Sequence, residues 1–275
     1  MKKALKIILP LAGAAAAAAA AAVFAVAPGK ADETQKAPFM RRNFAHRGLH
    51  KLDKSVPENS LSAFRRAAEA GYGVELDVHI TADGEIVVFH DDDLERMCGV
   101  HGSIEEMTFA GLSELSLLRT EERIPKLSEV FEVIDRRVPV IIELKTGKNN
   151  RELCEKTLML MDDYGGETCI ESFDPTIVRW FRRNAPDVLR GQLACRPEKY
   201  GEKTKKPLAF ILGNLLTNFL GRPHFIAYGI GKKPLTVRLC ERLGAMKVAW
   251  TSHGLDAQRD NDAVIFEYYR PPRSY

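Results

Sequence analysis

The chain has 275 residues, of which 45% are hydrophobic and 28% are charged, with 20 glycines and 14 prolines. This composition is typical of one or two globular domains and excludes collagen-like and intrinsically disordered chains. The formal net charge of +3 comes from Lys2, Lys3 and Lys6. The rest of the chain has equal numbers of basic and acidic residues, which gives no electrostatic reason to expect a nucleic-acid partner.

The amino-terminal segment, residues 1–27, begins with these lysines and continues through an uncharged stretch from Ile7 to Ala27. A helix of about 20 apolar residues can cross the hydrocarbon core of a bilayer. We therefore expect either a retained transmembrane anchor or a signal peptide cleaved after Ala25-Val26-Ala27. In both cases the lysines favour a cytoplasmic amino terminus, so the following domain is expected outside the cytoplasmic membrane, anchored or secreted. Residues 28–40 are predicted to form a linker.

Short β-branched runs then alternate with helical patterns, which predicts parallel βα units. Nine runs qualify as strands: Asn43–His46, Gly73–Val78, Ile86–His90, Pro139–Leu144, Thr168–Phe173, Gly191–Cys195, Phe225–Tyr228, Lys247–Thr251 and Val264–Tyr268. Residues 41–275 have the usual length of a (β/α)8 TIM barrel, which we prefer to an open doubly wound sheet. One of the nine runs is therefore surplus, and Phe225–Tyr228 has the weakest pattern.

Two local features accompany these strands. Between the first two runs, Asn59 is expected to cap a helix that ends at Gly71. Residues 91–122 depart from the alternation, because they are polar at first and then amphipathic and helical over Ile104–Leu118. We expect this segment to be a small insertion after the third strand.

Charged residues inside apolar strands are informative, because an ionised carboxylate without a partner is costly to bury. Glu75 and Asp77 are two residues apart in one run, as are Glu143 and Lys145 in another, so each pair projects from one face of the sheet. In a closed barrel that face is the interior. The three acids predict a hard oxygen site suited to Mg²⁺ or Ca²⁺. The alternative is an internal salt-bridge network in which Lys145 and Arg47 neutralise the acids.

Histidines end two of the runs. His46 ends the first run and His90 the third, so both are expected at the carboxyl-end rim, where barrel active sites form. Two imidazoles beside a divalent cation can act as general acid and base. Arg47 offers a planar fork and Lys145 a point charge, and both complement a phosphodiester.

Eight short motifs occur in order along the chain: His46-Arg47-Gly48, Pro57-Glu58-Asn59-Ser60, Glu75-Leu76-Asp77-Val78, Val88-Phe89-His90-Asp91, Ile124-Pro125-Lys126-Leu127, Glu143-Leu144-Lys145, Ser172-Phe173-Asp174-Pro175 and Trp250-Thr251. In this order the chain resembles the glycerophosphodiester phosphodiesterase family of the phospholipase-C-like barrels. The resemblance implies a (β/α)8 fold, one divalent cation and hydrolysis of glycerophosphodiesters to glycerol 3-phosphate and an alcohol.

The resemblance also implies roles for single residues. It implies that Glu75, Asp77 and Glu143 are metal ligands and that His46 and His90 are the acid/base pair. In similar enzymes the glycerol 2-hydroxyl attacks phosphorus and gives a cyclic phosphate that water then opens. We expect His46 to accept the first proton and His90 to deliver one to the leaving alcohol, or the reverse.

Three further residues match substrate-contacting positions of the family. Arg47 and Lys145 are implied to contact phosphate, and Glu58 either orients the site or contacts the glycerol. The chain departs from the family at Trp250-Thr251-Ser252-His253 and at Phe266-Glu267-Tyr268, which are expected to shape the leaving-group pocket.

Residues 208–220 are a second candidate for membrane contact. One helical stripe would hold Leu208, Ile211, Leu212, Leu215, Leu216 and Phe219, preceded by Lys203, Lys205 and Lys206. The segment is either an amphipathic helix in the headgroup region or a barrel helix that packs its stripe on the strands. Phe210, on the polar side, is the residue that barrel packing does not explain.

Three functions remain open. The leading one is a metal-dependent phosphodiesterase that acts on glycerophosphodiesters from lipid or from glycerol-phosphate polymer. The second is a phospholipase that cleaves intact lipid. The third is a membrane-tethered phosphodiester-binding protein without turnover.

Overall fold

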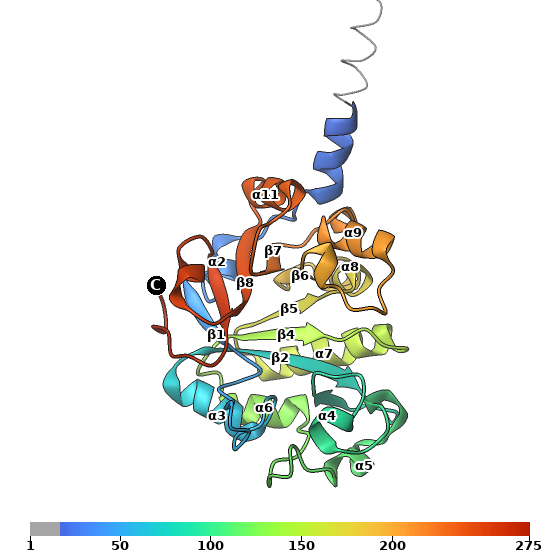
Figure 1. The fold of residues 1–275 in the computed structure, drawn as a ribbon, viewed down its shortest axis with the longest axis vertical. Helices are drawn as coiled ribbons and strands as arrows, with labels where there is room; N and C mark the ends of the chain where they lie inside the picture. Colours follow the sequence, from blue (N-terminus) through green and yellow to red (C-terminus); the bar gives the residue numbers. More distant parts are fainter. Residues whose placement is uncertain (1–16) are drawn as a thin grey trace, which may run out of the picture.

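The computed structural model describes residues 17–275. Within them, eight parallel strands form a closed barrel, because β1 pairs with both β2 and β9 and so joins the two ends of the sheet (Figure 1). The barrel strands are β1 (Arg42–His46), β2 (Gly73–Ile80), β4 (Val140–Leu144), β5 (Thr168–Ser172), β6 (Arg190–Ala194), β7 (Phe225–Gly229), β8 (Met246–Ser252) and β9 (Ala263–Phe266). The predicted (β/α)8 barrel is confirmed.

The surplus strand is β3 (Ile86–Val88), which pairs antiparallel with β2 outside the parallel barrel. Ile86–His90, the third of the nine runs, is therefore the surplus run, which the sequence had left unidentified. β7, which had the weakest pattern, is a barrel strand. β3 pairs antiparallel because its connection to β2 spans only residues 81–85. A parallel crossover needs a dozen residues or more, whereas a hairpin needs only a few.

Helices cover the outside of the barrel in Figure 1. The longer ones are α3 (Leu61–Ala70), α6 (Leu127–Ile134), α7 (Asn150–Tyr164), α8 (Pro175–Asn184), α9 (Lys206–Gly213) and α11 (Leu235–Arg242). Ser60, not Asn59, caps α3, since its hydroxyl accepts a hydrogen bond from the Ala63 amide. Gly71 ends α3 with φ of 76°, as expected for a left-handed cap.

The barrel interior is apolar at the amino-terminal end of the strands. Aromatic rings of Phe39, Phe44 and Phe225 fill it together with Met246 and Ile265. This packing needs glycine on neighbouring strands: Gly73 is paired with Phe44, and Gly191 with Phe225. In each pair a Cβ on the glycine would overlap with the ring. The rings therefore close the barrel at the amino-terminal end of the strands, and polar side chains lie at the opposite, carboxyl-end rim.

The insertion contains α4 (Glu95–Cys98), η1 (Ile104–Glu106) and α5 (Phe109–Ser113). It has its own small core, which includes Phe89, Leu94, Met97, Ile104 and Leu112. The helix expected over Ile104–Leu118 is shorter and broken, because the Thr108 hydroxyl caps a new helix by accepting from the Gly111 amide. The insertion is thus a compact unit attached beside β2 and β3.

Of the expected amino-terminal apolar helix, residues 1–16 lie outside the described part of the chain. Residues 17–26 are helical. From residue 17 to residue 275, no helix is long and apolar enough to cross a membrane. Residues 28–40 include α2 (Glu33–Lys36) and Phe39, whose ring is buried against the barrel.

The segment 208–220 does not form one helix. It is divided between α9 and the short α10 (Asn218–Gly221), and Leu215 between them is buried with φ of 57°. This left-handed residue breaks the predicted stripe. Phe210, Ile211 and Phe219 are exposed instead of packed on the strands.

Candidate active site

The predicted acid triad assembles at the carboxyl ends of two adjacent strands. Glu75 and Asp77 lie on β2 and Glu143 on β4, where Asp77 is in register with Glu143. Each side chain offers an oxygen within 4.8 Å of the other two, and all three are buried. Burial, together with the charges of Asp77 and Glu143, raises the pKa of Glu75 well above its usual range. Close buried acids of this kind need cationic partners.

Lys145 and Arg47 supply part of that charge. The Lys145 ammonium lies 2.9 Å from Asp77 and 2.8 Å from Glu143. Arg47 lies 3.4 Å from Asp77 through Nε, and its backbone amide donates to Glu75 at 3.0 Å. Burial alone would raise the pKa of Asp77, but Lys145 and other cations hold it well below its usual range. The salt-bridge network expected as the alternative is therefore present around the same acids.

These cations do not balance the acids. Glu171 on β5, in register with Glu143, is a fourth buried carboxyl of the barrel interior. Its Oε2 has no hydrogen-bond partner among the described residues, and burial raises its pKa. Four buried carboxyl groups face two cations, so ionisation of all four would leave an excess of negative charge. The all-oxygen donor set and this excess fit a hard divalent cation held by Glu75, Asp77 and Glu143.

His46 ends β1 and is in register with Glu75. Its Nδ1 lies 3.3 Å from Glu267, which follows β9, and His50 Nε2 lies 3.0 Å from the same carboxylate oxygen. Burial lowers the pKa of His46, whereas the hydrogen bond to Glu267 opposes this shift. The two histidines hold the pKa of Glu267 below its usual range against the effect of burial.

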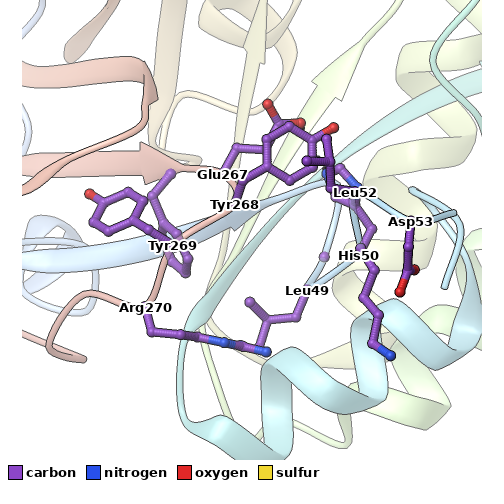
Figure 2. A pocket seen from close by; sticks show the side chains of 11 residues that line it. Leu49, His50, Leu52, Asp53, Glu267, Tyr268, Tyr269 and Arg270 are labelled. Carbon is purple, nitrogen blue, oxygen red and sulfur yellow. Dashed lines mark hydrogen bonds and ion pairs between the residues drawn. The ribbon is translucent and has the colours of Figure 1, made fainter. Parts of the chain in front are cut away.

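Glu267 also borders a cavity of about 640 Å³. Figure 2 shows the loop that carries His50 and Leu52 on one side of this cavity and the segment from Glu267 to Arg270 on the other. Gly48 enters this loop with φ of 80°, and its close neighbour is Ala63 of α3. The turn and this helix contact explain why residue 48 is glycine.

His90 reaches the same rim by a different route. It follows β3, whose antiparallel pairing returns the chain along β2, and the Phe89 amide donates to the Asp77 carbonyl at 3.0 Å. His90 Nδ1 lies 2.6 Å from Asp91. His90 is therefore beside the triad, although it does not end a barrel strand.

Glu58 lies in a chain of ion pairs at the edge of the rim. It contacts Arg47 at 2.6 Å and Arg96 of the insertion at 2.7 Å. Burial opposes its ionisation, but hydrogen bonds from Arg96 and the charge of Arg47 lower the pKa of Glu58 to about 2. Arg96 also contacts Asp91 at 2.6 Å. This chain connects the insertion to the phosphate-contacting candidate Arg47.

All eight predicted site residues therefore lie at one rim: His46, Arg47, Glu58, Glu75, Asp77, His90, Glu143 and Lys145. Ion pairs and hydrogen bonds join six of them to one another, whereas His46 contacts Glu267 and His90 contacts Asp91. The sequence did not identify two further parts of the site. One is Asn59, whose amide donates to Asp77 at 2.8 Å, and the other is the Glu267–His50 pair. Glu171 was also missed, although an acid in the apolar run Thr168–Phe173 meets the criterion that identified Glu143.

The other half of the rim is apolar. A cavity of about 630 Å³ lies between α9 and the ends of β5 and β8. Its lining includes Phe173, Tyr200, Leu208, Leu212 and Trp250. The rings of Phe173 and Trp250 pack edge to face, with centroids 5.6 Å apart. The rim thus combines a charged centre with an apolar neighbour.

Comparison with known proteins gives the family. A model described as "Glycerophosphoryl diester phosphodiesterase family" matches residues 46–260. A glycerophosphodiester phosphodiesterase of Caldanaerobacter subterraneus is 37% identical over 160 residues, which are 54% of this chain and 65% of that protein. Human lysophospholipase D GDPD1 is 32% identical over 153 residues, 51% of this chain and 47% of that protein. The chain therefore matches about half to two thirds of the length of these relatives.

Solved structures show the same fold. An Oleispira antarctica phosphodiesterase in complex with the product sn-glycerol-3-phosphate has a TM-score of 0.66 at 22% identity, covering 82% of this chain and 93% of that one. The family match extends from His46 almost to β9 and so includes all eight rim residues. The chain belongs to the glycerophosphoryl diester phosphodiesterase family.

Proposed function

We propose that this protein hydrolyses glycerophosphodiesters to glycerol 3-phosphate and an alcohol. The observation that carries the proposal is the meeting of three buried acids and two imidazoles at one rim of the barrel. Family membership supports the same reaction class.

Glu75, Asp77 and Glu143 would hold one divalent cation, Mg²⁺ or Ca²⁺. Such an ion supplies positive charge near phosphate oxygens and lowers the pKa of a nearby hydroxyl. Arg47 and Lys145 lie against the same acids and would orient the phosphate through charge-assisted hydrogen bonds. Glu58 positions Arg47 through their 2.6 Å contact.

His46 is suited to accept a proton from the attacking hydroxyl. Burial favours its neutral form, and Glu267 holds Nδ1, which leaves Nε2 as the free nitrogen. His90 is the matching donor to the leaving alcohol, since Asp91 at 2.6 Å from its Nδ1 fixes the orientation of the ring. General acid–base catalysis of this kind contributes about 10²- to 10⁴-fold in rate.

The direct test measures glycerol 3-phosphate released from glycerophosphocholine and glycerophosphoglycerol. We expect release by the purified protein, loss of release with a chelator, and a loss of about 10²-fold or more in His46→Ala. His101→Ala is the matched control, because its imidazole is 93% exposed. Binding of the diester in the presence of the cation without any turnover would contradict the proposal and favour a binding protein.

The apolar cavity favours a second candidate, cleavage of a lipid that carries an acyl chain. A cavity of about 630 Å³ lined mainly by aromatic and aliphatic side chains, with Asp174 and Lys199 among the polar ones, has the size and lining of a ligand site. A human relative is named a lysophospholipase D. Comparing lysophosphatidylcholine with glycerophosphocholine separates the two candidates: a higher kcat/KM for the acylated substrate that drops in Leu212→Ser would favour the lipid.

We further propose that the barrel acts outside the cytoplasmic membrane. The support is the sequence alone: basic residues followed by the uncharged stretch from Ile7 to Ala27. Protease added to intact cells should cleave a tag placed after Tyr275. Protection of that tag until the cells are opened would contradict this location.

A further inference from the structure

An exposed apolar surface surrounds the end of the helical segment 17–26. It consists of Phe24, Leu208, Phe210, Ile211 and Phe219, and we call it the apolar surface. Phe24 is 61% exposed and Phe210 is 57% exposed. The rings of Phe24 and Phe219 stack with centroids 5.9 Å apart, so the segment and α10 share this surface. In Figure 1, α9 lies next to the point where the segment leaves the barrel.

The end of the segment is fixed to the barrel by Arg222. Its guanidinium donates to the carbonyls of Phe24 at 2.7 Å and Ala27 at 2.8 Å, and it lies 4.7 Å from the centre of the Phe24 ring. Charged donors on two carbonyls at once fix both position and direction. We call these contacts the Arg222 latch.

Val26 adds packing to the latch. Its side chain is fully buried and packs in a cluster with Leu215, Tyr228, Val237 and Cys240. The Gly29 amide also donates to the Pro223 carbonyl at 2.9 Å. Cleavage after Ala27 would remove Phe24, Val26 and Ala27 together with their contacts to the barrel. The latch therefore favours the retained anchor over the cleaved signal.

The charge around the apolar surface is positive. Lys205 and Lys206 begin α9, and Arg182 and Arg183 end α8; all four are exposed. From Lys203 to Arg222 the sequence holds no acidic residue. Lys203 itself lies 3.6 Å from Asp92, so it is partly neutralised. Basic residues around exposed apolar side chains complement an anionic lipid surface.

We propose that the apolar surface rests on an anionic lipid bilayer and that the Arg222 latch holds the barrel in this orientation. The orientation rests on the membrane location proposed above. A bilayer fits better than a second copy of the chain, because the helical segment 17–26 meets the barrel at this surface and belongs to an uncharged stretch with the chemistry of a lipid interior. α9 then contacts lipid through Phe210 and Ile211 while Leu208 and Leu212 line the apolar cavity.

The test places an environment-sensitive fluorophore on the full chain at Phe210→Cys. Met159→Cys on α7, where the side chain is 64% exposed, is the matched control. Both carry Cys98→Ser, because Cys98 is the partly exposed cysteine of the described residues. The proteins are reconstituted into vesicles of phosphatidylcholine with or without about a third phosphatidylglycerol, which tests the anionic contribution.

We expect a blue shift of emission at position 210, larger with phosphatidylglycerol and smaller at high salt, and none at position 159. Water-like emission at position 210 in chains that remain in the vesicles would overturn the proposal. Chains that do not insert at all would contradict the membrane location instead. A shift that grows with the protein-to-lipid ratio would mean that a second copy covers the surface.

The latch has its own test in the same vesicles. Arg222→Ala should reduce the blue shift at position 210, because the barrel would no longer be held in one orientation, while the chain stays in the membrane. An unchanged shift in Arg222→Ala would overturn the role of the latch and leave only the surface.

Discussion

The Glu267 carboxylate accepts from both His46 and His50, so one side chain determines which nitrogen of His46 faces the rim. From the sequence, Glu267 could be identified only as a departure from the family pattern. Its partner His46 is distant in sequence, and only closure of the barrel through β9 and β1 brings the two together. The local pattern could show that Glu267 is unusual, but not what it contacts.

We predict that Glu267→Gln lowers kcat by about 10- to 1000-fold, because His46 loses the charge that orients its ring. The Glu267 contact raises the pKa of His46, so its loss lowers that pKa further. The acid limb of the pH profile of kcat/KM should therefore move to lower pH. Glu267→Asp, which keeps the charge, is the control, and an acid limb that moves to higher pH would contradict this account.

The two acids of β2 differ in what they do for the metal-free protein. The raised pKa of Glu75 means that its ionisation opposes folding. Its protonated form therefore stabilises the fold fully at low pH, and this stabilisation is lost as pH rises from about 4.5 through the folded-state pKa. The lowered pKa of Asp77 has the opposite sign: its ionised form stabilises the fold above its usual pKa of 3.8 and loses that effect as pH falls.

We therefore predict opposite effects of two substitutions in chelated protein at pH 8. Glu75→Gln should raise Tm, by about 2–4 °C for each kcal/mol gained. Asp77→Asn should lower Tm, because Lys145 and Arg47 lose their partner. Both should abolish activity and the Tm increase caused by added Mg²⁺ or Ca²⁺. Calorimetry checks this, with Glu69→Gln on the exposed side of α3 as the control; equal Tm changes for the pair would contradict it.

At the scale of elements, the strands and their parallel pairing were predicted well, and the exception is the antiparallel pairing of β3. Ile86–Val88 has the same β-branched pattern as a barrel strand, and periodicity does not distinguish parallel from antiparallel pairing. The signal that was available is Asp83-Gly84, a turn dipeptide within a short connection. Together with the length of the connection, this dipeptide identifies a hairpin and removes Ile86–Val88 from the barrel. The remaining eight runs, which include Phe225–Gly229, then fill the eight barrel positions.

The pairing of glycine with an aromatic ring across two strands gives an element-scale prediction. Gly191→Ala should destabilise the protein by about 1–3 kcal/mol, because the added methyl overlaps with the Phe225 ring. Phe225→Leu removes part of that ring and leaves a gap. The double variant should be more stable than the sum of the single changes predicts, by about 0.5–3 kcal/mol. Urea denaturation of the four proteins measures this, and strict additivity would contradict the contact.

For the whole molecule, the eight motifs in order were enough for the barrel and for the rim residues, because family motifs encode which residues meet. They did not predict that the helical stripe breaks at Leu215 or that the Val26 side chain is buried against the barrel. Both depend on how segments distant in sequence fit together, which a one-dimensional stripe does not contain. The apolar exposure of Phe210 was the feature of that segment that the sequence did indicate.

Attachment of the insertion beside the barrel predicts that activity is lost before the barrel unfolds. His90 is held by β3 and by Asp91 and Arg96, whereas the triad is held by the barrel. Units with separate small cores can open locally at lower free energy than the whole domain. Residual activity should therefore fall at a lower urea concentration than barrel circular dichroism does, and Arg96→Ala should widen the gap. Coincident transitions in the parent and in Arg96→Ala would contradict this.

The strand order also decides how a substrate can enter. Neighbouring β1, β2, β4 and β5 carry the acids and His46. On the other side, Cys195 directly follows β6, Gly229 ends β7 and Trp250 lies within β8. The rim is therefore charged along one arc and more apolar along the other, where Ile230 and Trp250 lie beside Arg196 and Lys199. We therefore expect a diester with one polar and one apolar arm to bind in a single orientation, in which each arm lies against the arc of matching polarity.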